Sequence, residues 1–336
     1  MTPFPAPAPH FLAIALAVTL AYGPASAQDI RDADAKSYPN RTVRIIVPFP
    51  PGGPADIVAR FVGQKMSEDW GQPVVIENRA GGNTTIGAQA AARSAADGYT
   101  LFVPMDTTMV MNPLITPNLP YDPFKDFSPI TLLTKNMSLV VVRSDGPRTI
   151  KDLIGRAKAA PGKLNMGAGT ITSRLGAILF AKSAGLDVQL VPFKGSPEIG
   201  QAVLAGTVDF ALDSTGTSLP LIEAGRYRAL AKYSNRPLPM LPDLPSLSDA
   251  ADLPGLEESA TWIALAAPAG TPGTIVDKIQ REVATIYSDP AMVARLEKAG
   301  ILAVASATPS EFAAFIRSET ERWSKVLKES GNIRLD

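Results

Sequence analysis

The residues of this sequence that are best suited to bind or transform a ligand lie in loops rich in glycine, proline and hydroxyl side chains. The segment 49–54 (FPPGGP) has no charged side chain and leads directly into a helical pattern of apolar residues. Gly52 and Gly53 let the backbone approach a ligand, and a helix that begins there points its free N–H groups at the same place. Such a loop is typical of a cradle that binds an anion through main-chain amides. The alternative is a Pro/Gly turn that only connects a strand to a helix.

Later loops have a similar polar character and could form a second rim around a ligand. They are residues 105–108 (MDTT), 167–173 (GAGTITS), 194–196 (KGS) and 213–216 (DSTG). The second of them is not a dinucleotide-binding fingerprint, because Thr172 stands where G-x-G-x-x-G needs its third glycine. Facing rims of hydroxyls, amides and a few charges suit a small, polar and anionic molecule, which makes Asp106, Thr107 and Arg174 candidate ligand-binding residues. Arg174 and Lys194 are the nearest basic side chains, and a solvated surface position is the alternative for each.

The composition excludes most forms of side-chain catalysis and metal binding. The 336 residues include no cysteine and a single histidine, His10. Without cysteine there are no disulfides, thiolate metal sites or cysteine nucleophiles. His10 lies in a segment that we expect to be removed, so imidazole ligands and Ser-His-Asp catalysis are excluded from the mature chain, and we expect no metal and no cofactor. With 32 Lys+Arg against 32 Asp+Glu, the chain lacks the basic excess of a nucleic-acid-binding protein.

The N-terminal segment has the pattern of an export signal. Residues 11–22 (FLAIALAVTLAY) are almost wholly apolar, and Ala25-Ser26-Ala27 follows before Gln28. A short apolar core with an A-x-A site indicates a signal peptide over residues 1–27, cleaved after Ala27, and hence a protein of the periplasm. The core is too short to cross a bilayer, which needs roughly 20 apolar residues. No Lys or Arg precedes the core, which is unusual for a signal, and a Pro/Ala-rich tail is the alternative.

Short apolar runs alternate with helical patterns, and these elements must position the loops. The first unit is expected to have strands at 43–47, 74–76 and 99–103, with helices between them. Strands and helices in turn, without hairpin turns, indicate right-handed crossovers and a mostly parallel sheet. The same order repeats after Ser144, with strands expected at 164–166, 188–193, 208–212 and 227–232.

The tail predicts that the chain crosses between two lobes twice. After a proline-rich connector at 236–254, a strand is expected at 261–267, followed by helices that should return to the first unit. We therefore expect crossings near residues 138 and 262, with a hinge and a cleft between the lobes. Trp262 could form an apolar wall of that cleft or, as the alternative, simply pack in a core. The expected fold class is two-lobed α/β with two mostly parallel sheets, in which lobe 1 comprises residues 38–138 plus 263–336 and lobe 2 residues 139–262.

Nine short segments, taken together and in order, are specific enough to indicate a known family. They are Tyr38-Pro39 with VRIIVPFPPGG (43–53), GQPVVIENRAGG (71–82), ADGYTLFV (96–103), NPLITPNLPYDPFKDFSPI (112–130), PGKLNMG (161–167), VPFKGSPE (191–198), AGTVDFALD (205–213), LPDLPSL (241–247) and APAGTP (267–272). With these segments, which span essentially the whole mature chain, the sequence resembles the periplasmic substrate-binding proteins of tripartite tricarboxylate transporters, the Bug-type or TctC-like receptors.

The resemblance implies a Venus-flytrap receptor, with the type II-like fold of periplasmic binding proteins, that closes on one small organic acid. In that family the ligand carboxylate is held largely by main-chain amides and ordered waters. The resemblance also implies that the partners are membrane components of a tripartite tricarboxylate-type transporter, and we expect a monomer. Carried over residue by residue, it places around the cleft Phe49, Gly52, Gly53, Thr108, Thr170, Thr172, Ser173, Gly195, Ser196 and Asp213.

Two positions depart from the family pattern. Pro54 stands where the family usually has Ser or Thr, which removes a hydroxyl from the first cradle. The loop 167–174 is about two residues shorter than the family pattern, and Arg174 stands where His is usual. Because an arginine fork can pair bidentately with a carboxylate, Arg174 could bind a distal carboxylate of the ligand.

Two other function classes stay open. A secreted enzyme that acts on carboxylic acids would need Asp106, Asp213 or Lys194 as its acid or base, with a pKa shifted by burial. The spacing does not pair these residues convincingly. A sensor subunit that presents its closed form to a signalling partner is the third reading.

Overall fold

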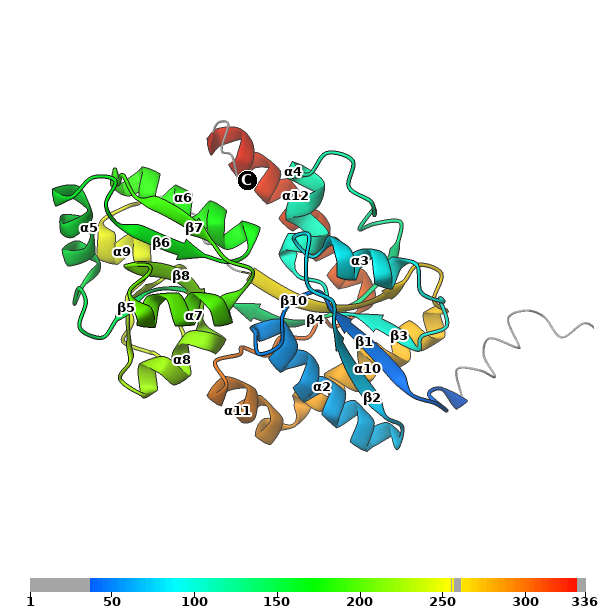
Figure 1. The fold of residues 1–336 in the computed structure, drawn as a ribbon. Coiled ribbons are helices and arrows are strands. Elements are labelled where there is room, and N and C mark those ends of the chain that lie inside the picture. Colours follow the sequence, from blue (N-terminus) through cyan, green and yellow to red (C-terminus); the bar gives the residue numbers. More distant parts are fainter. Residues whose placement is uncertain (1–36, 255, 257–260, 331–336) are drawn as a thin grey trace, which may run out of the picture.

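The chain folds into two five-stranded sheets that lie side by side, each covered by helices (Figure 1). The computed structural model describes residues 37–254, 256 and 261–330, so the expected signal peptide lies outside the described residues. The first sheet has the order β2-β1-β3-β10-β4, with β1 (Val43–Val47), β2 (Val74–Asn78), β3 (Thr100–Phe102), β4 (Phe127–Asn136) and β10 (Thr261–Pro268). The second has the order β7-β6-β8-β5-β9, with β5 (Ser138–Arg143), β6 (Asn165–Ala168), β7 (Gln189–Pro192), β8 (Phe210–Ser214) and β9 (Tyr227–Lys232).

Each sheet is parallel except for one strand. In the first sheet β1 is parallel to β2 and β3, whereas β10 runs antiparallel to both β3 and β4. In the second sheet β6 is parallel to β7 and β8, whereas β5 runs antiparallel to β8 and β9. The prediction of a two-lobed α/β fold with two mostly parallel sheets is confirmed.

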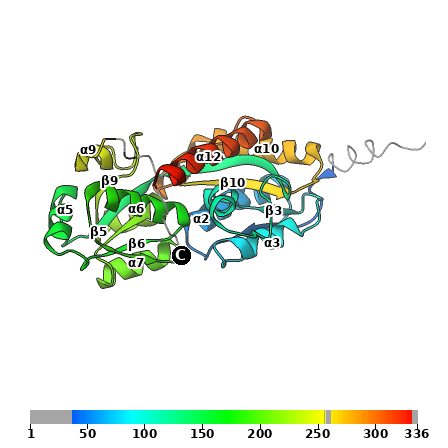
Figure 2. The ribbon, with the colours of Figure 1, turned by 90° about the horizontal axis from the view of Figure 1, so that it is seen from above.

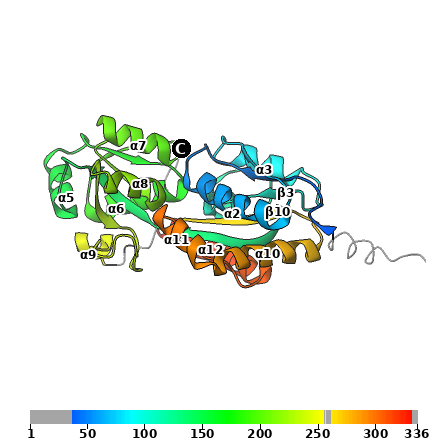
Figure 3. The same cartoon turned by 90° about the horizontal axis from the view of Figure 1, so that it is seen from below.

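Helices cover both faces of each sheet, as the buried side chains show. The helices that accompany the first sheet are α2 (Pro54–Trp70), α3 (Thr85–Ala92), the π-helix η1 (Thr107–Met111), α4 (Asn112–Ile115), α10 (Gly273–Ser288), α11 (Pro290–Lys298) and α12 (Pro309–Ser330). Those of the second are α5 (Ile150–Ala159), α6 (Ile171–Ala184), α7 (Ser196–Ala205), α8 (Thr215–Glu223) and α9 (Leu247–Ala251). One apolar core of the first sheet joins α2, α10 and α11, and the other joins α3, η1 and α12. Figures 2 and 3 show the resulting elongated molecule from above and below.

Local signals explain where several helices begin and end. The Thr149 side chain accepts a hydrogen bond from the Asp152 N–H and the Asp152 side chain accepts one from the Thr149 N–H, which is a complete capping box at the start of α5. Helix α2 ends at Gly71, whose φ of 63° lies in the left-handed region that glycine tolerates best. These residues therefore fix the ends of the helices that frame the loops.

The chain passes between the sheets twice, and the segments concerned form the hinge. Strand β4 ends at Asn136 and β5 begins at Ser138, so only Met137 separates a strand of one sheet from a strand of the other. On the return, Leu253 and Leu256 pack against the core of the second sheet and Thr261 begins β10 of the first.

The strand assignments shift the expected boundaries slightly. Ser138 belongs to the second sheet, and Thr261 and Trp262 belong to the first, which differs from the expected limits of lobe 2 by one residue and by two. With this adjustment we keep the division into two lobes: lobe 1 is the first sheet with its helices, including the C-terminal ones, and lobe 2 is the second sheet with its helices.

A third contact joins the lobes beside the hinge. Gly300 follows α11 in lobe 1 with a φ of 72°, and a Cβ placed on it would lie 2.7 Å from the carbonyl oxygen of Thr215. The same Cβ would lie 2.8 Å from the Cα of Gly216, so backbone meets backbone at the start of α8 in lobe 2. Thr215 in turn donates its N–H to the carbonyl of Met137, at 3.1 Å. Because no side chain fits there, this contact requires glycine at position 300.

Within the part of the chain that the structure describes, none of the helices combines the length and the apolar composition needed to span a bilayer.

Candidate ligand-binding site

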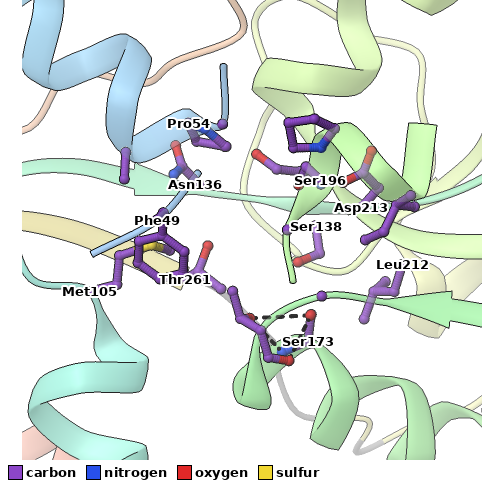
Figure 4. A pocket seen from close by; sticks show the side chains of 18 of the residues that line it. Phe49, Pro54, Met105, Asn136, Ser138, Ser173, Ser196, Leu212, Asp213 and Thr261 are labelled. Carbon is purple, nitrogen blue, oxygen red and sulfur yellow. Dashed lines mark hydrogen bonds between the residues drawn. The ribbon is translucent and has the colours of Figure 1, made fainter. Parts of the chain in front are cut away.

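A pocket lies between the two lobes, next to the hinge. Phe49, Pro54, Met105, Asn136 and Thr261 line it from lobe 1, and residues of lobe 2 such as Ser138, Ser173, Ser196, Leu212 and Asp213 line it from the other side (Figure 4). The space between them, including its opening to solvent, is about 570 Å³.

About half of the expected site residues line this pocket. They are Phe49, Gly53, Thr170, Ser173, Gly195, Ser196 and Asp213. The remaining candidates, which are not among the described residues that line it, are Gly52, Asp106, Thr107, Thr108, Thr172 and Arg174.

The N-termini of four helices converge on the pocket. Helices α2, α6, α7 and α8 begin after Gly53, Thr170, Gly195 and Ser214, and each of these N-cap residues lines the pocket. The first N–H groups of a helix have no acceptor within the helix, and the helix dipole adds partial positive charge at that end. The described lining residues include no Lys, Arg or His. Backbone dipoles are therefore the source of the positive charge that the described lining presents to a ligand, and such helix ends favour an anion.

Loops of the two lobes meet at the rim of the pocket. A Cβ placed on Gly195 of lobe 2 would lie 3.9 Å from the Cδ of Pro50 in lobe 1. Likewise, a Cβ on Gly53 would lie 4.0 Å from the Cδ of Pro197. The glycine-rich loop after β1 and the loop before α7 therefore lie so close together that a methyl group on either glycine would touch a proline of the neighbouring segment.

The loop after β1 is held by Asp56, on the first turn of α2. Asp56 is buried and accepts hydrogen bonds from the Gly52 N–H, the Asn78 amide and the Arg60 guanidinium, each at 2.9 Å. Burial alone would raise the pKa of Asp56, but these hydrogen bonds outweigh it and lower the pKa below its ordinary value. Asn78 also donates to the Phe49 carbonyl at 3.1 Å.

This network corrects the expected role of Gly52. The Gly52 N–H donates to the carboxylate of Asp56 rather than pointing at a ligand. Its φ of 81° instead allows the sharp turn that brings Gly53 to the pocket. Pro54 has no N–H to offer, so the main-chain donors of this helix start are the N–H groups of Ala55 and Asp56, which have no acceptor within α2.

Asp213 is the one ionisable residue among the described residues that line the pocket. It is only 2% exposed, and its carboxylate accepts hydrogen bonds from the Ser214 N–H at 2.8 Å, the Ser218 hydroxyl at 3.0 Å and the Thr217 hydroxyl at 3.3 Å. Burial raises the pKa of Asp213 to about 6, although these hydrogen bonds and one from Ser196 act in the opposite direction. This carboxyl group therefore changes its charge close to neutral pH.

Asp106, Thr172 and Arg174 connect the lobes beside the pocket. The Thr172 hydroxyl of lobe 2 donates to the carboxylate of Asp106 in lobe 1, whose pKa burial raises to about 7. The guanidinium of Arg174 donates to the side-chain oxygen of Asn83 in lobe 1, at 3.1 Å, and burial lowers the pKa of Arg174. The structure thus places Arg174 in an interlobe hydrogen bond, where the sequence predicted a ligand carboxylate.

The two threonines at the start of η1 are buried in lobe 1. Thr107 is 2% exposed and Thr108 is fully buried. The Thr108 hydroxyl donates to the Thr84 hydroxyl at 2.9 Å, and its carbonyl accepts from Tyr121 at 2.7 Å. Thr108 therefore fixes the loop after β3 rather than lining the pocket.

Trp262 packs within lobe 1. It is 2% exposed, and its ring makes edge-to-face contacts with Phe312 and Phe315 of α12, at centroid distances of 5.8 and 5.6 Å. It is not among the described residues that line the pocket. Of the two readings of this residue, the geometry favours packing.

Sequence reasoning missed the residues at the hinge side of the pocket. Asn136, Ser138 and Thr261 line it from the strands that connect the lobes. No motif in the sequence pointed to these three residues, because their strands were not expected (β4 and β5) or carried no polar motif (β10). Ser214 could have been named, since it follows Asp213 in a loop that the sequence had already singled out.

The described lining residues do not assemble an acid-base pair. Asp213 lines the pocket, whereas Asp106 and Lys194 do not belong to its described lining. The described part of the chain also contains no cluster of three or more His, Cys, Asp or Glu that could hold a metal ion. The pocket instead presents fixed backbone dipoles and hydroxyl groups around a partly apolar space, and this arrangement suits the binding of a ligand.

Comparison with known proteins places the chain among solute receptors. The family model described as "Tripartite tricarboxylate transporter family receptor" matches residues 58–332. A "UPF0065 protein in tcbD-tcbE intergenic region" of Pseudomonas sp. (strain P51) is 38% identical over 296 residues, which cover 87% of each chain. Two solved structures are also similar. R. palustris Rpa4515 with adipate has a TM-score of 0.83 and 33% identity, covering 88% of this chain and 98% of that one. MatC from Rhodopseudomonas palustris with bound malate has a TM-score of 0.78 and 31% identity, covering 86% of this chain and 100% of that one.

The family match covers most of the chain, and the relatives align along nearly their whole lengths. Their fold agrees with the two mixed sheets and the pocket between the lobes. The chain belongs to the tripartite tricarboxylate transporter receptor family.

Proposed function

We propose that this protein is a receptor that binds a small organic acid between its lobes and delivers it to the membrane components of a tripartite tricarboxylate-type transporter. The observation that carries the proposal is the convergence of four helix N-caps on one pocket whose described lining has no basic side chain. Structures of relatives with adipate and with malate support a carboxylate as the ligand. The protein works as a monomer, without a metal, a cofactor or catalysis.

The geometry explains how a carboxylate is held without an arginine or lysine. Hydrogen bonds from backbone N–H groups to an ionised acceptor are about twice as strong as those between neutral groups. The helix ends come from both lobes, with α2 in lobe 1 and α6, α7 and α8 in lobe 2. A ligand that accepts hydrogen bonds from both lobes therefore stabilises the arrangement in which they are close together.

The test of this function is a thermal-shift screen against straight-chain and aromatic carboxylic acids, with the matching primary amides as uncharged controls. At a ligand concentration of 100 times Kd, binding adds about 2.7 kcal/mol to the stability of the folded state. For a protein of this size that corresponds to a rise in Tm of roughly 5 to 10 °C. We expect such a rise with at least one acid, and none with its amide at the carboxylate end. If no acid raises Tm, or if the acid is chemically converted during incubation, the proposed function is wrong.

Export to the periplasm forms part of the same proposal. Residues 1–27 would direct export and be removed after Ala27, which leaves Gln28 as the first residue of the mature protein. The membership of a periplasmic receptor family supports this location. N-terminal sequencing of the protein from a periplasmic extract checks the cleavage site, and a mature chain that starts elsewhere would contradict it.

Asp213 should make acid binding dependent on pH. Because burial raises the pKa of Asp213 to about 6, the carboxyl group is ionised at pH 8 and largely neutral at pH 5.5. At pH 8 the ionised Asp213 repels an anionic ligand, and at pH 5.5 this repulsion is largely absent. We therefore expect the affinity for the acid to increase about threefold to tenfold as the pH falls from 8 to 5.5. Isothermal titration at several pH values measures this effect.

The matched control for this prediction is Asp213→Asn, which keeps the shape and removes the charge. It should bind the acid at pH 8 about as tightly as the wild type does at pH 5.5, with a flatter pH profile. Any remaining slope belongs to other groups, such as Asp106, whose pKa is about 7. An unchanged slope in Asp213→Asn would show that Asp213 does not sense the ligand.

A further inference from the structure

Two hydrogen bonds join the lobes beside the pocket, and both come from the first turn of α6. The Thr172 hydroxyl donates to the Asp106 carboxylate, and the Arg174 guanidinium donates to the side-chain oxygen of Asn83 at 3.1 Å. Thr172 and Asp106 are fully buried, and Arg174 is 7% exposed. Hydrogen bonds with a charged partner are stronger than those between neutral groups, and burial protects them from competition by water. Both bonds therefore favour the arrangement in which these parts of the lobes are close together.

Apolar side chains of α6 extend this contact into the core of the opposite lobe. Ile171 and Leu175 belong to lobe 2, yet they are part of the buried cluster that contains Met109 and Val110 of η1 in lobe 1. Ile171 is 2% exposed and Leu175 is fully buried. Separation of the lobes at this place would expose the two side chains to water, which is unfavourable. Apolar packing and the two hydrogen bonds thus form one interface between the start of α6 and lobe 1.

The same helix start also faces the pocket. Thr170, the N-cap of α6, and Ser173 line the pocket, whereas Thr172 and Arg174 contact lobe 1. A single helical turn therefore holds the groups that face the ligand and the groups that contact the other lobe at fixed distances from each other. A ligand that draws this turn toward lobe 1 also brings the interlobe contacts together, so ligand binding and these contacts reinforce each other.

Lobe 1 presents Asn83 on an unusual backbone turn. Asn83 and Thr84 have φ values of 49° and 77°, a conformation that is uncommon for asparagine and rare for a β-branched residue such as threonine. Buried hydrogen bonds hold this turn. The Asn112 side chain donates to the Asn83 carbonyl at 2.7 Å, and the Thr108 hydroxyl donates to that of Thr84 at 2.9 Å. Backbone strain held in this way is frequent at functional sites, and here it positions the oxygen that Arg174 contacts.

We propose that this interface is an interlobe clasp, which increases the affinity of the receptor for its ligand without touching the ligand. Its polar members are Asn83, Asp106, Thr172 and Arg174. The inference rests on the proposed function and adds residues that position the lobes. Because the clasp joins the lobes in the same way whichever acid is bound, it stabilises every closed complex equally. It should therefore raise the affinity for all acids by one common factor, slow their release and leave their ranking unchanged.

The experiment removes the Arg174–Asn83 contact from either side. Asn83→Gly removes the acceptor at a position where glycine tolerates the positive φ, and Arg174→Met removes the guanidinium but keeps an apolar side chain. The probes are hexanoate, adipate and benzoate, together with any other acid that raises Tm in the screen. We expect each variant to weaken every acid that binds by about threefold to tenfold, through faster dissociation. The double variant should be no weaker than the weaker single variant, because both changes remove the same bond.

Asn83→Asp is the matched variant with the opposite expected effect. Aspartate also tolerates a positive φ, and its carboxylate would form an ion pair with Arg174. We expect Asn83→Asp to bind every acid at least about twofold more tightly, and to lose this gain when Arg174→Met is added. The new negative charge alone would repel an acid, so a gain can come only from the pair. Isothermal titration gives the affinities, and stopped-flow displacement gives the dissociation rates.

Thermal unfolding without ligand checks that the variants are folded. Asn83 is exposed, so its two variants carry the test if Arg174→Met does not fold.

The outcomes separate the clasp from the proposed function. If Arg174→Met weakens only acids with a second carboxylate, Arg174 contacts the ligand, and the clasp is wrong while the receptor function stands. Additive losses in the double variant, or unchanged affinities in every variant, overturn the clasp in the same way. If no acid binds to the wild type, the receptor function fails, and the clasp fails with it.

Discussion

Replacing Thr170 with aspartate is expected to lower the affinity for the acid ligand by a factor of at least about 100, with little change in stability. Thr170 is the N-cap of α6, where its side chain accepts a hydrogen bond from the Ser173 N–H, and it lines the pocket. Aspartate is at least as good an N-cap as threonine, so the helix keeps its cap. The negative charge of this aspartate, however, repels the carboxylate of the ligand. Two like charges about 4 Å apart repel each other by about 4 kcal/mol at an effective dielectric constant of 20, which exceeds the 2.7 kcal/mol that corresponds to a 100-fold change.

The control for Thr170→Asp is Thr170→Asn, which places a side chain of the same shape and capping ability there without the charge. We expect Thr170→Asn to bind within about fivefold of the wild type and both variants to melt close to the wild-type temperature. Isothermal titration gives the affinities and thermal unfolding gives the melting temperatures. Equal loss in both variants would mean that shape, and not charge, decides binding at this helix end.

Replacing Trp262 with alanine is expected to lower the free energy of unfolding by about 3 to 5 kcal/mol. The indole is 2% exposed and packs edge-to-face on Phe312 and Phe315, so its removal leaves a large cavity between β10 and α12. Loss of a buried tryptophan combines the lost transfer free energy with the cost of that cavity. Urea unfolding followed by far-UV circular dichroism measures the change.

Trp262→Phe is the matched control, because it keeps an aromatic ring against α12. The free energy of unfolding of Trp262→Phe should fall by less than half as much as that of Trp262→Ala. If Trp262→Ala were as stable as the wild type but failed to bind the acid, the residue would instead contact the ligand, which was the other reading of its position.

Several strands with uninterrupted apolar runs were predicted from the sequence, although the equally apolar β5 (Ser138–Arg143) was overlooked. VRIIV became β1 (Val43–Val47), and the apolar run expected at 261–267 became β10 (Thr261–Pro268), whose residues are all buried. The long hinge strand β4 was not expected, because Pro129, Thr131, Thr134 and Lys135 interrupt its apolar pattern. One of its buried threonines has a partner far away in the sequence: the Thr131 hydroxyl accepts a hydrogen bond from the Ser306 N–H at 2.9 Å. The local pattern of hydrophobicity cannot predict a hydrogen-bond partner that is so distant in the sequence.

For the site, too, local sequence motifs predicted some residues correctly, whereas contacts to other residues determined the positions of the rest. Loops at the carboxyl ends of parallel strands were expected to gather at one edge, and that rule brought Phe49, Gly53, Thr170 and Gly195 to one pocket. It did not foresee the hydrogen bond of Arg174 to Asn83, which lies 91 residues earlier in the chain and in the other lobe. It also failed for Gly52, because the competing acceptor was the nearby carboxylate of Asp56.

The backbone contact at Gly300 has a consequence for how the protein opens. It lies next to Met137, where the chain passes from β4 to β5, so two ties between the lobes are close together. Rotation of one lobe about an axis through these two connections leaves both in place. Every other point then moves by an amount that increases with its distance from the axis. The tips at Pro50 and Gly195 would then travel further than the pivot itself. Sliding or twisting of one lobe against the other would break the close approach at Gly300, so this contact favours opening by rotation about the hinge over the other motions.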